Sequence, residues 1–94
     1  MQKSKIETFI GFSIKSGKII FGLDSIEKYR KKIHLIVLSN SISDNSKAKV
    51  LNIAQDRNID VLELEDSLEN ITKRKNCKVL AITSFELANA IKNS

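Results

Sequence analysis

The stretch that decides the fold is IHLIVL, residues 33–38, a nearly continuous apolar run interrupted only by His34. A strand that is buried on both faces of a sheet has this composition, because neither of its faces meets water. The run is far shorter than the ~20 apolar residues that a membrane-spanning helix needs. It therefore predicts a buried strand over residues 33–38.

Outward from this run, strand-like and helical segments alternate. Short runs rich in β-branched and aliphatic residues predict further strands over residues 18–21, 61–64 and 79–82. Apolar residues at helical spacing predict a first helix over residues 3–15 and a third helix that ends at Asn58. The side chains expected to face inward are Ile6, Phe9, Ile10 and Ile14 in the first helix and Val50, Leu51 and Ala54 in the third.

The other helices are predicted from the spacing of capping boxes, in which a polar residue is followed three positions later by a glutamate. Asp24 with Glu27 predicts a second helix to about residue 31. Asp66 with Glu69 predicts a short fourth helix that carries Leu68 and Ile71. Thr83 with Glu86 predicts a last helix, whose inward-facing residues are Leu87, Ala88 and Ile91. The order α-β-α-β-α-β-α-β-α predicts a three-layer α/β/α sandwich around a four-stranded mixed sheet. With 94 residues, one domain over residues 1–94 accounts for the chain.

Several classes of protein are excluded by composition. The single cysteine, Cys77, cannot form an intramolecular disulfide, and no cluster of cysteine and histidine is available for zinc. Met1 is not followed by a charged and then apolar signal stretch, so we expect a cytoplasmic protein.

Catalytic chemistry has little support in the sequence. His34 lies in an apolar run, and Cys77 has no second cysteine or histidine near it in the sequence. The glycines at 11, 17 and 22 fit neither dinucleotide-binding nor phosphate-loop spacing. The acids at 63, 65, 66 and 69 are interpreted as solvated charges rather than metal ligands. We therefore expect a non-enzymatic protein without a metal or cofactor.

Charge is the informative property. The net charge is +5, and five acids without a base lie in residues 60–69, directly before a basic loop. One basic cluster ends the second helix at residues 28–32, and the other is the loop KRKNCK at residues 73–78. Such a loop repels itself unless an anion lies against it, so the pattern suggests a polyanionic partner.

Three segments carry a resemblance to a known family: GFSIKSGKIIFG (11–22), IHLIVLSNSISDNSKAKV (33–50) and KVLAITSFELANAI (78–91). Together they resemble the kink-turn-binding ribosomal protein superfamily, and within it the bacterial YlxQ-type ribosomal-protein-like branch. That superfamily has a G-A-N-E-x-x-K motif that reads sharply bent RNA. In this chain Gly22 and Lys28 match the motif, whereas Asp24 stands at the asparagine position and Ser25 at the glutamate position.

The resemblance implies a ribosome-associated protein that binds rRNA or another structured RNA, including kink-turn RNA. The expected RNA-binding residues are Lys18, Gly22, Asp24, Ser25, Lys28, Lys32, Asn40, Arg74, Lys75 and Lys78, with the acidic segment 60–69 pointing away from the RNA. The alternative is a protein-interaction adaptor that uses the acidic edge and has no specific RNA target.

Overall fold

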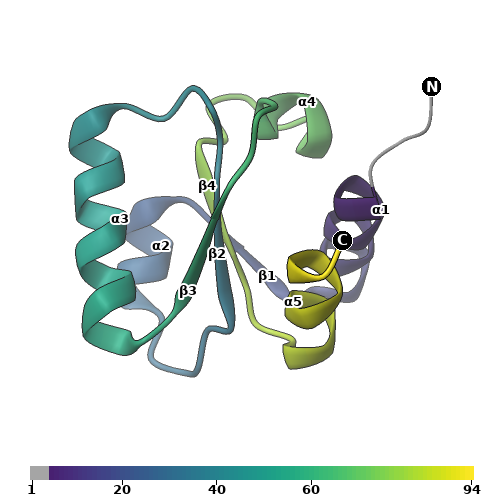
Figure 1. Ribbon diagram of the computed structural model, residues 1–94, viewed down its shortest axis with the longest axis horizontal. Helices are drawn as coiled ribbons and strands as arrows, with labels where there is room; N and C mark the ends of the chain where they lie inside the picture. Colours follow the sequence, from purple (N-terminus) through teal and green to yellow (C-terminus); the bar gives the residue numbers. More distant parts are fainter. Residues whose placement is uncertain (1–4) are drawn as a thin grey trace.

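The computed structural model describes residues 5–94, in which helices and strands alternate along the chain (Figure 1). The helices are α1 (Lys5–Ser16), α2 (Leu23–Lys28), α3 (Asp44–Arg57), α4 (Leu68–Thr72) and α5 (Phe85–Lys92). The strands are β1 (Ile19–Phe21), β2 (Leu35–Leu38), β3 (Asp60–Glu63) and β4 (Val79–Ile82). The predicted element order is confirmed, and residues 3 and 4 of the expected first helix lie outside the described residues.

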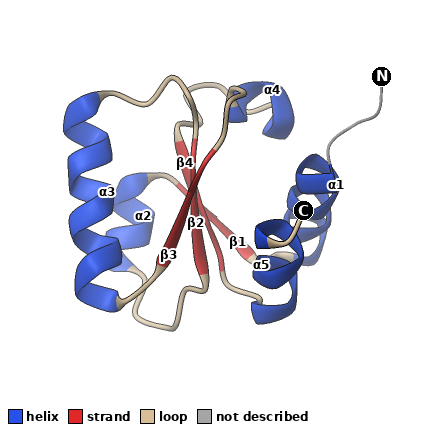
Figure 2. Cartoon of the chain, viewed as in Figure 1, coloured by secondary structure: helices blue, strands red, loops and turns tan. Residues whose placement is uncertain are grey.

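The four strands form one mixed sheet in the order β1-β4-β2-β3. Strands β2 and β3 are parallel, and α3 crosses between them because parallel neighbours need a long connection. Strand β4 is antiparallel to both of its neighbours, with Ile82 opposite Leu35 on one side and Ile19 on the other. Helices α2 and α3 cover one face of the sheet and α1, α4 and α5 cover the other, which confirms the sandwich (Figure 2).

The core lies on both sides of the two central strands, whose residues are all buried. Side chains alternate along a strand, so Leu35 and Val37 pack in the cluster that includes Ile10 of α1 and Ile91 of α5. The intervening residues of β2, Ile36 and Leu38, pack toward α2 and α3 on the other face. A continuous apolar run is thus explained by a strand with no solvent-facing side.

Helix ends differ from the prediction by short shifts. Helix α4 is capped by Ser67, whose hydroxyl accepts a hydrogen bond from the Glu69 N–H, and α5 is capped by Ser84. The predicted caps, Asp66 and Thr83, each lie one residue too early, because a serine hydroxyl next to them reaches the free N–H groups. The left-handed end of α3 at Asn58 is confirmed, with φ 55°.

Helix α2 departs furthest from its expected form. It begins at Leu23 after Gly22, with no side-chain cap, so the predicted Asp24 capping box is wrong. It ends at Lys28, well before residue 31. At this end Arg57 of α3 donates to carbonyl groups of the last turn, and the chain turns into an extended conformation at Tyr29.

Two of the side chains expected to face inward are exposed. Ile14 of α1 is 37% exposed and Leu51 of α3 is 42% exposed. In α1 the fully buried positions are Ile10 and Ser13, and Ser13 satisfies its hydroxyl by donating to the Phe9 carbonyl. The face of α1 is therefore rotated relative to the predicted one, because a small serine allows close packing that an apolar pattern does not reveal.

Candidate nucleic-acid interface

Three sequence-distant segments meet where β4 begins, at the top of the sheet in Figure 1. The Gly22 N–H donates to the Val79 carbonyl at 3.1 Å, and the Ser39 N–H donates to the Lys78 carbonyl at 2.9 Å. Strand β4 thus enters the sheet between the β1–α2 junction and the turn after β2. We call residues 22–25, 39–41 and 73–78 the upper surface.

The β1–α2 junction depends on the backbone of Gly22. Its φ of 88° and ψ of 150° lie in a region that only glycine adopts readily. A Cβ at this position would meet nothing within 4 Å, so the requirement for glycine is conformational rather than steric. Asp24 and Ser25 follow in the first turn of α2 with exposed side chains.

The basic loop, residues 73–78, is held in place by Glu69. The carboxylate accepts hydrogen bonds from the Asn76 N–H at 2.6 Å and from Lys78 Nζ at 3.0 Å. Lys78 Nζ also donates to the Ser41 hydroxyl at 2.9 Å. The Lys78 ammonium and the Asn76 N–H hold the pKa of Glu69 below its ordinary value. Glu69 therefore contacts the loop, so it is not the solvated charge that the sequence suggests, and it lies beside a loop that is expected to bind RNA.

The remaining cations of the loop are available to a ligand. The exposed cations are Lys73, Arg74 and Lys75. Within residues 5–94, neither Lys73 nor Lys75 forms an ion pair. The Arg74 guanidinium lies 4.0 Å from the centre of the Phe21 ring, a cation–π contact that restricts the side chain without neutralising it. Lys73 is in the left-handed conformation and ends α4.

The turn after β2 places one neutral polar side chain on the same surface. Asn40 is exposed, and its amide nitrogen donates to the Glu65 carbonyl at 2.7 Å. This bond fixes the side chain and leaves the amide oxygen as an acceptor.

Three predicted RNA-binding residues lie elsewhere. The Lys18 carbonyl accepts from the Thr83 N–H at 3.1 Å, which places Lys18 where β4 ends rather than where it begins. Lys32 is two residues before His34, whose N–H donates to the Ile82 carbonyl at the same end of the sheet. Lys28 is the last residue of α2, about 9 Å along the helix from Gly22. The structure therefore divides the predicted set between the two ends of the sheet and the far end of α2.

The two candidate nucleophilic or basic residues lie in the core or next to it. Cys77 is only 6% exposed and lies in the core cluster that includes Leu68 and Leu80. His34 is half-buried just before β2, one residue earlier than the strand itself. Among residues 5–94, no group of three acidic, histidine or cysteine side chains could hold a metal ion.

A second basic feature was not anticipated from the sequence. Arg57 donates to the carbonyl groups of Ile26 at 3.1 Å, Glu27 at 2.8 Å and Tyr29 at 3.1 Å, so one guanidinium satisfies the end of α2. An arginine at the last turn of α3 would ordinarily be assigned to its own helix dipole. These bonds join residues that are far apart along the chain, so they leave no local signal in the sequence.

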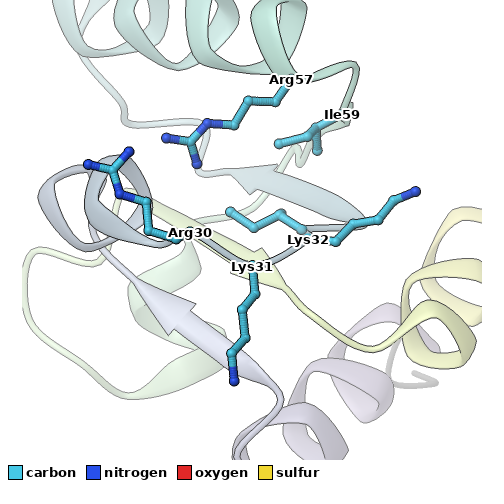
Figure 3. A pocket seen from close by; sticks show the side chains of 6 residues that line it. Arg30, Lys31, Lys32, Arg57 and Ile59 are labelled. Carbon is cyan, nitrogen blue, oxygen red and sulfur yellow. The ribbon is translucent and has the colours of Figure 1, made fainter.

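Arg57 also lines a shallow pocket of about 410 Å³ together with Arg30, Lys31 and Lys32 (Figure 3). The figure shows that the side chains of Arg30, Lys31 and Lys32 point away from one another. Arg57 already donates to carbonyl groups, and the side chains of the other cations point apart. The pocket therefore does not bring several free cations to one place where a small anion would bind.

No family model and no curated protein matches the chain. A solved structure does match: a protein with unknown function from Bacillus halodurans C, at a TM-score of 0.82 and 13% sequence identity. The match covers 97% of this chain and 96% of the other, so the whole α/β architecture is shared. Within residues 5–94, no helix is both long and apolar enough to cross a membrane.

Proposed function

We propose that this chain is a non-enzymatic RNA-binding protein of the cytoplasm, associated with the ribosome, that binds structured RNA through the upper surface. The observation that carries the proposal is the meeting of a glycine-led helix start, a polar turn and the basic loop at the beginning of β4. Segments from three parts of the chain contribute backbone, neutral polar and cationic groups to one place. RNA backbones are bound by groups of these kinds.

The electrostatics of the upper surface favour phosphate contacts. Lys73, Arg74 and Lys75 are exposed, whereas Glu69, the acid that contacts the loop, already has two donors. Lys78 is occupied by Glu69 and Ser41, so we assign it to holding the loop rather than to direct contact. Phosphate contacts of this kind make affinity fall steeply with salt.

Kink-turn recognition is the specific form of the proposal, on the resemblance to the kink-turn superfamily. Gly22 and Ser25 stand at the β1–α2 junction where that motif would meet RNA, with Lys28 one turn further. Asp24 is exposed at the same turn and brings a negative charge toward phosphate. A serine hydroxyl is a donor and acceptor suited to a 2′-OH or a base edge at short range.

The adaptor alternative is less well supported, because much of the acidic segment is already paired within the chain. Asp60 lies 2.7 Å from Lys92 Nζ, and Glu63 lies 2.8 Å from Lys47 Nζ. With Glu69 bound by Lys78, three of the five acids in residues 60–69 have internal partners.

The proposal is tested by titrating labelled kink-turn RNA and a plain duplex at two salt concentrations. Lys75→Glu should weaken binding and reduce the salt slope by about one for each phosphate that the variant no longer binds. Lys49→Glu is the matched control, since Lys49 is an exposed lysine of α3 and the change in net charge is the same. Equal affinities for the two variants would contradict the upper surface, and no RNA binding by the native chain would contradict the function.

A further inference from the structure

The end of the sheet opposite the upper surface carries an exposed aromatic ring. Phe85, the first residue of α5, is 60% exposed, more than any other large hydrophobic side chain in residues 5–94. The fold does not need it there, because Ser84 caps the helix and Ala88 and Ile91 bury its inner face. An exposed ring beside charged groups is a candidate contact for a ligand.

His34 fixes the Phe85 ring from one side. The two ring centres are 5.5 Å apart at an interplanar angle of 69°, an edge-to-face arrangement. The backbone N–H of His34 donates to the Ile82 carbonyl at 2.9 Å, which places His34 beside the end of β4. The ring therefore stands at the end of the central strands, with most of its surface open to solvent.

Two lysines lie at the same end of the sheet as this ring. Lys18 lies beside Thr83, two residues before Phe85, through the hydrogen bond between its carbonyl and the Thr83 N–H. Lys32 is exposed two residues before His34, whereas the Lys31 side chain points away from that of Lys32 (Figure 3). Within the described chain, neither Lys18 nor Lys32 forms an ion pair.

Two acidic residues at this end bear on the ring. Asp60, which stands opposite Leu35 at the start of β3, is bound to Lys92 at 2.7 Å. Glu86 is exposed next to Phe85 and is the acidic side chain that a negatively charged ligand would have to avoid. Together, Lys18, Lys32 and Glu86 carry a net charge of +1.

We propose that this rim, made of Lys18, Lys32, His34 and Phe85 and here called the lower surface, binds an unpaired nucleotide of RNA. The base stacks on Phe85, and the neighbouring phosphates lie against the lysines. Aromatic rings in cationic grooves bind single-stranded nucleic acid in this way, because every base offers a flat face. The inference rests on the proposed function only in taking RNA as the ligand, and it uses residues at the other end of the sheet.

The lower surface also accounts for predicted residues that the upper surface leaves out. Lys18 and Lys32 are separated from the upper surface by the length of the strands, four residues in β4 or about 13 Å. One folded RNA with an unpaired nucleotide can meet both ends over this distance. Lys18 and Lys32 would then contact the same RNA at a second place.

The chain has no tryptophan, so Phe85→Trp creates a single fluorescent reporter at the ring. We expect a short unstructured oligouridylate to quench this fluorescence saturably, and Lys18→Gln with Lys32→Gln to shift the titration to higher oligonucleotide concentration. Leu51→Trp is the control, since Leu51 is exposed on α3, in the layer on the other face of the sheet. Quenching of both reporters to the same extent would overturn the site.

A second measurement uses the native ring. Phe85→Leu should lower the affinity for oligouridylate roughly fivefold or more, as loss of one stacked base does, with circular dichroism and thermal unfolding unchanged. Equal quenching of the Phe85→Trp reporter by a fully paired duplex or by polyglutamate would overturn base stacking. If the native chain binds kink-turn RNA but the reporter ignores oligouridylate, this inference fails while the proposed function stands. If the reporter responds and Lys75→Glu has no effect, the lower surface stands and the upper one fails.

Discussion

The ammonium group of Lys78, at the end of the basic loop, lies 3.0 Å from Oε1 of Glu69 in the helix that precedes the loop. The same carboxylate receives the Asn76 N–H, and the same ammonium reaches the Ser41 hydroxyl. Helix α4, the loop and the turn after β2 are thereby tied at one point. A charge in the acidic segment thus serves to shape the cationic surface, and removing it should change how the loop is held.

Glu69→Gln should lower the free energy of unfolding at neutral pH and make it less dependent on pH in the acidic range. Because the pKa of Glu69 in the folded chain lies below its ordinary 4.5, the contribution is fully present above that value. It is lost as the pH falls through the lowered pKa, so the two proteins should become equally stable in acid. Denaturant unfolding over a pH series measures this difference. Glu65→Gln is the control, because this exposed residue offers only its carbonyl to Asn40. The same pH response in both variants would show that the Glu69 contacts contribute nothing.

Gly22→Ala and Gly11→Ala should have opposite effects. Neither added Cβ meets an atom within 4 Å, so backbone conformation alone decides the result. At Gly22, with φ 88°, alanine should cost roughly 1–3 kcal/mol of unfolding free energy. At Gly11, inside α1, alanine should add about 0.5–1 kcal/mol through its better helix propensity. Thermal or urea unfolding distinguishes the two, and a stabilised Gly22→Ala variant would contradict the assigned backbone.

Arg57→Lys should be destabilising even though it keeps the charge. A lysine ammonium cannot reproduce the planar fork that bonds the carbonyl groups of Ile26, Glu27 and Tyr29. We expect a loss of roughly 1–2 kcal/mol, with faster amide hydrogen exchange at the end of α2. Lys49→Arg, on the exposed face of the same helix, should stay within about 0.5 kcal/mol. Unchanged exchange in α2 would show that its end does not depend on Arg57.

Asp24→Asn should strengthen binding to kink-turn RNA. Asp24 makes no cap bond in α2, so the substitution leaves the helix start intact and removes only an exposed charge. Relief of one repulsion near phosphate corresponds to roughly 1 kcal/mol, or about fivefold in affinity. Asp56→Asn, an exposed acid of α3, changes the net charge equally and should have little effect. If both variants bind as the native chain does, residue 24 does not face the RNA.

Much of the fold was predictable because its signals are local. Apolar continuity predicts the strand within residues 33–38 and the strand Val79–Ile82. The helix end at Asn58 is predicted because asparagine tolerates a left-handed backbone. The strand order and the antiparallel placement of β4 depend on which surfaces meet in space, and no local pattern records them.

The candidate site was only partly predictable for the same reason. The basic loop and Gly22 are visible in the sequence, but the pairing of Glu69 with Lys78 and the stacking of Arg74 on Phe21 join segments that only the fold brings together. Sequence spacing alone does not show that Lys18 and Lys32 lie away from the upper surface, since the direction of β4 decides which end of the sheet they occupy.

The two edges of the sheet limit how any partner can approach. Strand β1 has only three residues, and β3 begins and ends with the exposed acids Asp60 and Glu63, each joined to a lysine of a covering helix. Short edges and charged edges discourage another chain from adding a strand. The protein should therefore resist sheet extension and edge-to-edge aggregation.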